Sequence, residues 1–196
     1  MLQWRAMGEG DLAGVRVVSD AVHPELPESD AVLRERLRLY PEGCHVLAGA
    51  NATIGGYVIS HPIRPYEPPV LDRLLGALPS DATQYYVHDI ALDPRLRGGG
   101  HARPIVEQLL AHARSFDSMA LISVYGTAHS GRNSASAPRS ALWIKRYRPM
   151  GRAHCSWFGQ KADPGFRSHI SAPAFRGGRF RLRTLCDQFD HLFVFR

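Results

Sequence analysis

The sequence predicts an α/β (α+β) fold for residues 1–129, and two observations lead to this prediction. Strand-like and helix-like stretches alternate along these residues, which is typical of domains that pack helices against a sheet. The most regular series is a strand over 85–94, three glycines at 98–100, a helix from Ile105 and a strand over 120–126. A chain of 196 residues is long enough for one such domain with its own core.

One strand and two helices are predicted ahead of that series. Residues 2–7 form a short strand. Residues 9–22 form a helix because apolar side chains recur at every third or fourth position, namely Leu12, Val15, Val18 and Val22. Residues 29–40 form a second amphipathic helix, and either Ser29 or Asp30 is suited to be its N-cap.

Two further strands and one loop complete the expected order of elements. Residues 44–60 contain two apolar stretches on either side of the turn residues 49–52, so we expect two strands there. Residues 61–70 contain four prolines, which predicts an irregular loop. From Ile105 onward a helical period places Ile105, Val106, Leu109, Leu110 and Ala113 on one face.

Composition argues against several classes of protein. No apolar run approaches the roughly 20 residues that a membrane span needs, and the first residues lack the layout of a signal peptide. Three scattered cysteines do not make a disulfide framework, so we expect a cytoplasmic protein with no membrane partner. His23, His45, His61 and Cys44 do not have the spacing of metal ligands, and no metal site is predicted.

The positive charge of the chain is confined to its last third. Residues 1–129 carry 11 arginines, no lysine and 15 acidic residues, a net charge of −4. Residues 130–196 carry 13 basic residues against three aspartates, a net charge of +10. Such an asymmetry indicates that the two parts differ in kind.

Residues 98–100, all glycine, place bare backbone between a strand and a helix. Backbone N–H groups in the first turn of a helix have no partner within the helix, and the helix dipole is positive there. The pattern therefore predicts an anion site, with Pro104 suited to the first turn because it has no N–H group. A plain tight turn is the alternative.

Two well-known phosphate-binding motifs do not fit this loop. A P-loop requires Lys followed by Ser or Thr after its last glycine, and His101 and Ala102 stand there instead. A dinucleotide-binding GxGxxG motif would require a third glycine where Arg103 stands.

The stretch "HDIALDPRLRGGGHARPIVEQLL", residues 88–110, resembles the central motif of the GNAT superfamily of N-acetyltransferases. That motif has a strand ending in an Ala-apolar-Asp-Pro run, then Arg/Gln-x-x-Gly-x-Gly/Ala, then a helix; here Arg97, Gly100 and Ala102 occupy its fixed positions. The resemblance covers residues 1 to about 129. It implies a mixed, mostly antiparallel sheet with splayed central strands flanked by helices.

The resemblance also implies acetyl-CoA as the acetyl-donor cosubstrate. By this likeness the backbone of the glycine loop holds the diphosphate, and its residues are Arg97, Gly98, Gly99, Gly100, His101, Ala102 and Arg103. The pantetheine arm would lie against the preceding strand at Ile90, Ala91 and Leu92, bonding to main chain as an added strand does.

Acetyl transfer to an amine needs a base, and the strand before the glycine loop offers two candidates. Relatives often use a carboxylate on or near this strand, which makes Asp89 the candidate catalytic residue. His88 is the alternative. Because side chains alternate along a strand, we expect the two to point to opposite faces of the sheet.

The family pattern breaks after residue 129. Residues 130–196 lack an apolar period, and we expect this basic tail to be irregular or poorly ordered. One added base after the codon for His129 lets "HSGRNSAS" be read as "HFWAKFGF", the aromatic motif that the family has next. We therefore hypothesise that residues from Ser130 are translated out of frame. At face value, the arginines, glycines and aromatics at 175–183 are typical of an RNA-binding segment.

The function predicted from the sequence is N-acetyl transfer from acetyl-CoA to a primary amine. The alternative is a catalytically impaired acetyl-CoA-binding fragment whose basic tail binds nucleic acid, a partner that the charge distribution disfavours. The sequence leaves open the acceptor, small molecule or protein, and the oligomeric state, a homodimer included.

Overall fold

The structure, a computed structural model, describes residues 1–123, 140–145 and 154–158. The strands are β1 Gln3–Ala6, β2 Cys44–Ala48, β3 Ile54–Ile63, β4 Gln84–Leu92, β5 Ser118–Ser123, β6 Ser140–Lys145 and β7 His154–Phe158. The helices are α1 Leu12–Val22, α2 Asp30–Leu39 and α3 Ala102–His112, with short 3-10 turns at 9–11, 41–43, 94–96 and 113–115.

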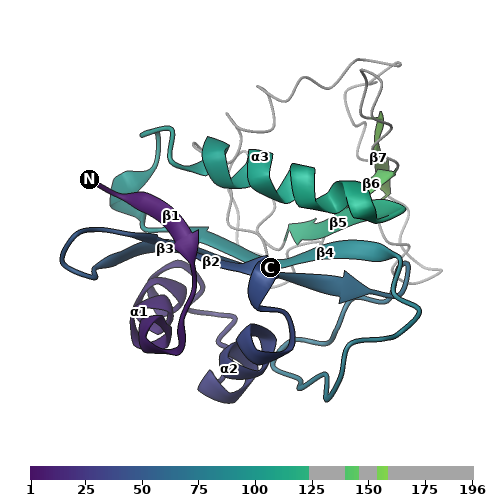
Figure 1. Ribbon diagram of the computed structural model, residues 1–196, viewed down its shortest axis with the longest axis horizontal. Coiled ribbons are helices and arrows are strands. Elements are labelled where there is room, and N and C mark those ends of the chain that lie inside the picture. The colour runs from purple at the N-terminus through teal and green to yellow at the C-terminus, as the bar shows by residue number, and fades with distance from the viewer. Residues whose placement is uncertain (124–139, 146–153, 159–196) are drawn as a thin grey trace, which may run out of the picture.

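The strands form one sheet in the order of the chain, β1 to β7. Every neighbouring pair is antiparallel except β4 and β5, which are parallel because α3 crosses over between them. The sheet has α1 and α2 on one face and α3 on the other (Figure 1). This confirms the predicted mixed, mostly antiparallel sheet flanked by helices.

The helices α1 and α3 bury the faces that the sequence predicts. In α1 the buried apolar residues are Leu12, Val15, Val18 and Val22, and they pack with Tyr57 and Ile59 of β3. Ser29 is the residue at the N-cap position of α2. The buried apolar residues of α3 form a second core with the opposite face of the sheet; they are Ile105, Val106, Leu109 and Leu110.

The strand β3 is longer than the sequence predicts and includes the first three residues of the expected loop, His61 to Ile63. Pro62 lies opposite Tyr85 of β4, although proline interrupts most strands. Pairing between β2 and β3 ends at Ile59, so β3 has a neighbour on one side only from Ser60 onward. A proline is tolerated at such an edge because the N–H group that it lacks is not needed there.

Two strands lie in the segment that the sequence analysis expects to be irregular, which corrects that expectation for residues 140–145 and 154–158. β6 and β7 pair with each other, and β6 also pairs with β5. Their sequences, SALWIK and HCSWF, contain the branched and aromatic residues that strands favour. The rest of 130–196, including the proposed RNA-binding stretch at 175–183, lies outside the described residues.

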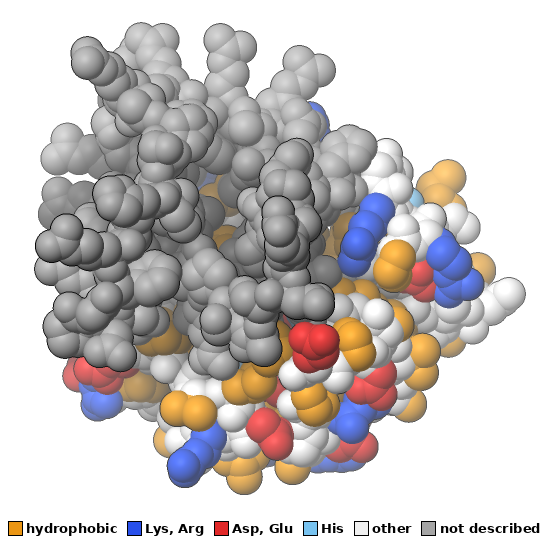
Figure 2. Space-filling model, turned by 180° about the vertical axis from the view of Figure 1, so that it is seen from behind, with side chains coloured by type: hydrophobic (Ala, Val, Ile, Leu, Met, Phe, Trp, Pro, Cys, Tyr) orange, Lys and Arg blue, Asp and Glu red, His pale blue; other side chains and the backbone are white. Residues whose placement is uncertain are grey.

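The described surface carries mixed charge on the face that Figure 2 shows, where acidic and basic side chains are interspersed among apolar ones. Within the described residues, no helix is both long and apolar enough to cross a membrane.

Candidate active site

The site begins where the two central strands part. β4 pairs with β5 only from Gln84 to Val87. Beyond Val87, β4 continues to Leu92 and pairs with β3 alone among the described residues. Among the described residues, the edge of β4 over His88 to Leu92 has no partner on the β5 side, so that backbone groups there can receive an extended ligand. The splayed strands that the sequence predicts are confirmed.

A β-bulge at His88 lies at the point of separation. Ile59 of β3 pairs with Asp89 and the next residue, Ser60, pairs with Val87, which leaves His88 as the extra residue. The bulge shifts the alternation of side chains along β4: Val87 packs in the core beneath α3, whereas Ala91 packs with α1.

The bulge corrects the prediction that His88 and Asp89 point to opposite faces. His88 bonds to Glu28 and Asp89 bonds to His23, and both partners belong to the segment from the end of α1 to the start of α2. Two consecutive side chains of β4 thus lie on the same side of the sheet, where both can serve one site. Strict alternation fails because the inserted residue breaks it.

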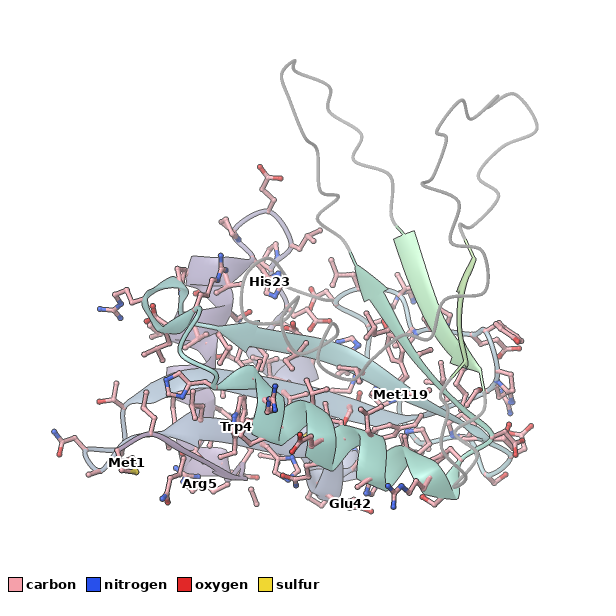
Figure 3. The ribbon with its side chains drawn as sticks, turned by 90° about the horizontal axis from the view of Figure 1, so that it is seen from above. Met1, Trp4, Arg5, His23, Glu42 and Met119 are labelled. Atoms are coloured by element: carbon pink, nitrogen blue, oxygen red, sulfur yellow. The ribbon has the colours of Figure 1, made fainter. Side chains whose placement is uncertain are left out.

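Asp89 is fully buried and accepts hydrogen bonds on both carboxylate oxygens. His23 Nε2 donates to Oδ1 at 3.0 Å, and the hydroxyl of Tyr57 in β3 donates to Oδ2. His23 lies just beyond the end of α1 (Figure 3). A carboxylate that accepts a hydrogen bond from one ring nitrogen fixes the tautomer and the orientation of the imidazole.

His88 is the centre of a second cluster of buried polar side chains. Its Nε2 lies 3.0 Å from each carboxylate oxygen of Glu28. The rings of His61 and Tyr86 lie against it, with centroids 5.6 and 5.9 Å away. Burial, helped by the neighbouring His88, lowers the pKa of His61 to about 3, so that His61 is neutral at physiological pH.

The glycine loop has the conformation that an anion site requires. Gly98 and Gly100 have φ angles of +76° and +75°, a left-handed conformation that side chains disfavour. A Cβ on Gly100 would meet no atom within 4 Å, so the space above its backbone is open. Successive N–H groups in such alternating conformations turn inward and form an anion-binding concavity.

The N–H groups of this loop have the capacity to bind a ligand. Those of Gly98, Gly100 and His101 find no acceptor among the residues that the structure describes. Arg97 and Arg103 are exposed and form no ion pair with the described residues. Arg95, in contrast, forms an ion pair with Asp93, with 2.5 Å between Nη2 and Oδ2. N–H donors with no acceptor and two exposed arginines with no ion pair among the described residues fit a diphosphate.

The residues that the sequence predicts for the pantetheine site can contact a ligand through their backbone. The side chains of Ile90 and Leu92 are buried in the core beneath α3, and that of Ala91 is buried against α1. Only the main chain of these residues is available at the open edge. Within the described residues, no group of three or more His, Cys, Asp or Glu side chains could hold a metal ion.

Sequence reasoning missed three polar residues that meet β4 at the bulge: His23, Glu28 and Tyr57. They are 66, 60 and 32 positions, respectively, from their partners on β4. No local pattern marks them, because their pairing depends on how α1 and β3 pack against β4. The one signal in the sequence is that polar residues stand next to apolar ones that pack in the core, because core positions rarely carry polar side chains.

Solved structures share this fold at low sequence identity. The GphF GNAT-like decarboxylase in complex with isobutyryl-CoA is 22% identical, with 64% of this chain and 67% of that chain covered and a TM-score of 0.56. The loading GNATL domain of CurA from Lyngbya majuscula is 13% identical, with 65% and 67% covered and a TM-score of 0.58. No curated protein matches the sequence.

The family is established by the sequence itself. The sequence model of the acetyltransferase (GNAT) family matches residues 15–162, which is more than half of the chain. The match includes the strand, glycine loop and helix on which the resemblance was based, and it confirms the predicted class of enzyme, a GNAT-type acyltransferase. The chain belongs to the acetyltransferase (GNAT) family.

Proposed function

We propose that this protein transfers the acetyl group of acetyl-CoA to a primary amine. The observation that carries the proposal is the continuity of two binding features along one stretch of chain. Among the described residues, the unpaired edge of β4 ends at Leu92, and the glycine-loop N–H groups that find no acceptor follow from Gly98. An extended arm that ends in a diphosphate matches these features in the same order.

Neighbouring structures support a CoA thioester as the donor. One structure of similar fold, the GphF GNAT-like decarboxylase, is a complex with isobutyryl-CoA. The choice of acetyl over other acyl groups rests on the family to which the chain belongs.

In the proposed reaction the amine nitrogen attacks the thioester carbonyl, the new C–N bond forms and the C–S bond breaks. The nitrogen must lose its proton, and the thiolate of CoA must gain one. The bulge at His88 lies where the strands part, so that the reacting carbonyl would lie near His88 and Asp89.

Asp89 supports the proton transfer through His23. Because both of its oxygens already accept hydrogen bonds, Asp89 does not receive the proton directly. His23 Nδ1 takes the proton, and the Asp89 carboxylate stabilises the imidazolium that results. Tyr57 holds the second carboxylate oxygen and fixes the orientation of Asp89.

The test is a transferase assay that detects free CoA thiol in the presence of acetyl-CoA. Acceptors are drawn from four classes: a polyamine, free amino acids, an aminoglycoside and a peptide with a free N-terminus. We expect amine-dependent thiol release with at least one class and the acetylated amine in the product. Thiol release at the same rate without any amine would contradict transfer to an amine.

A further inference from the structure

A hydrogen bond from the first strand reaches the end of the glycine loop. The indole N–H of Trp4 in β1 donates to the carbonyl oxygen of His101, with 2.7 Å between the two atoms. The bond joins residues 97 positions apart and is partly buried. Figure 3 shows Trp4 near the N-terminal end of α3. His101 is the residue immediately before α3, and no side chain caps the helix there.

The start of the loop is fixed by a separate set of contacts. Asp93 N–H donates to the carbonyl oxygen of Gly55 in β3 at 2.9 Å. Leu96 lies so close to Gly55 that a Cβ there would be 2.5 Å from Leu96 Cδ1. Leu2, the residue before β1, lies beside the same glycine. The loop is therefore held at its beginning by β3 and at its end by Trp4.

Between these two fixed ends the loop has few restraints of its own. Gly98, Gly99 and Gly100 are exposed. Among the described residues, their N–H groups make one backbone hydrogen bond, a long one of 3.4 Å from Gly99 N–H to the carbonyl oxygen of Leu96. Glycine has the largest backbone freedom of any residue, so such a loop samples many conformations unless its ends are fixed. A loop that is already ordered binds its ligand more tightly, because less conformational entropy is lost on binding.

We propose that Trp4 is a positioning residue for the anion site of the glycine loop. Its indole N–H fixes the His101 carbonyl and thereby aims the N–H groups at the start of α3 toward the diphosphate. This inference rests on the proposed binding of CoA, and it assigns a function to an edge strand that takes no part in the reaction.

The test compares two substitutions that each remove one hydrogen bond to the ends of α3 and keep an aromatic ring. Trp4→Phe removes the bond at the N-terminal end. Tyr40→Phe removes the bond between the Tyr40 hydroxyl and His112 Nε2, 2.6 Å long, at the C-terminal end. Both residues pack against the same core beneath α3. A general loosening of the helix would affect both variants equally, whereas a positioning role would affect only the first.

Two quantities are measured for each variant of the full chain: hydrogen exchange of the amides from Arg97 to Ile105 without ligand, and the Kd for CoA by calorimetry. We expect Trp4→Phe to speed exchange in this stretch and to weaken CoA binding about fivefold, the change that one net hydrogen bond represents. Tyr40→Phe should leave both quantities unchanged.

The two readouts separate this inference from the proposed function. Unchanged exchange in Trp4→Phe, or equal effects of the two variants, would overturn the role of Trp4 even if the wild type binds CoA. If the wild type does not bind CoA, the proposed function is wrong, and so is the role of Trp4 at an anion site. Hydrogen exchange then still shows whether Trp4 orders the loop.

Discussion

Asp89 is the residue on which the proposed chemistry depends most. It is fully buried between His23 and Tyr57, and neither partner is near it in the sequence. The sequence predicts Asp89 as a catalytic candidate from its place on the strand, but the sequence gives no sign that the carboxylate acts through a histidine. That pairing is a product of tertiary packing, which brings the end of α1 onto β4.

Replacing Asp89 with asparagine should lower kcat by about 100-fold or more, since the imidazolium of His23 would lose its carboxylate. The Kd for CoA should stay within about twofold, because the glycine loop is unaffected. The measurements are steady-state kinetics with the best acceptor and calorimetry. Asp20→Asn, which changes an exposed carboxylate on α1, is the matched control. An Asp89→Asn enzyme with the kcat of the wild type would contradict the assigned role.

His61 should make the protein less stable as the pH falls. Its pKa is about 3 in the folded protein, against about 6.5 when unfolded, so the unfolded state binds the proton more tightly. Above pH 7 the contribution of His61 to the free energy of unfolding is close to zero, and stability is lost progressively as the pH falls below about 6.5.

The His61 prediction is checked by urea unfolding at pH 7 and pH 5. From pH 7 to pH 5 the wild type should lose about 2 kcal/mol more than His61→Gln, which has no proton to bind at this position. Equal losses in the two proteins would show that His61 is not held neutral. The difference between the two proteins cancels the contributions of histidines that do not contact His61.

At the scale of elements, the junction between α2 and β2 is tightly packed against β3. A Cβ on Gly43 would lie 2.1 Å from the carbonyl oxygen of Ser60 and 2.6 Å from Tyr40 Cδ1. Gly43→Ala should therefore lower the free energy of unfolding by about 2–3 kcal/mol, the cost of forcing packed atoms apart. Gly10→Ala is the control, because its Cβ would meet nothing within 4 Å. Denaturant unfolding measures the stability of both variants, and equal stabilities would contradict the tight packing at Gly43.

The order of elements up to residue 123 could be predicted from the sequence, because each helix and strand has its own apolar period. Val15 and Val18 mark the buried face of α1, and the three glycines mark the start of α3. The bulge at His88 could not be predicted, because it is set by the pairing of β3 with β4. The extension of β3 through Pro62 was missed for a similar reason: proline is excluded only where a neighbouring strand needs its N–H group.

At the scale of the whole molecule, the charge of the chain changes sign after residue 129, from −4 to +10. The hypothesis of an out-of-frame segment from Ser130 remains a prediction, and most of that segment lies outside the described residues. Resequencing the gene across the codons for Thr127 to Ser136 tests it. We expect one additional base after the codon for His129; an unchanged sequence would make the basic tail a genuine part of the protein.

The central claim is that the glycine loop binds the diphosphate of a CoA thioester. Calorimetric titration of acetyl-CoA into three proteins tests it most directly: the wild type, Gly100→Glu and Gly76→Glu. Gly76 is the matched control. Like Gly100, it has a positive φ, of +73°, and open space where a Cβ would stand, but it lies outside the glycine loop, in the loop before β4.

Both substitutions cost similar backbone strain, and only Gly100→Glu places a negative side chain where the diphosphate would lie. We predict that the wild type and Gly76→Glu bind acetyl-CoA with similar Kd and that Gly100→Glu binds at least tenfold more weakly. Equal binding by all three proteins would contradict the claim.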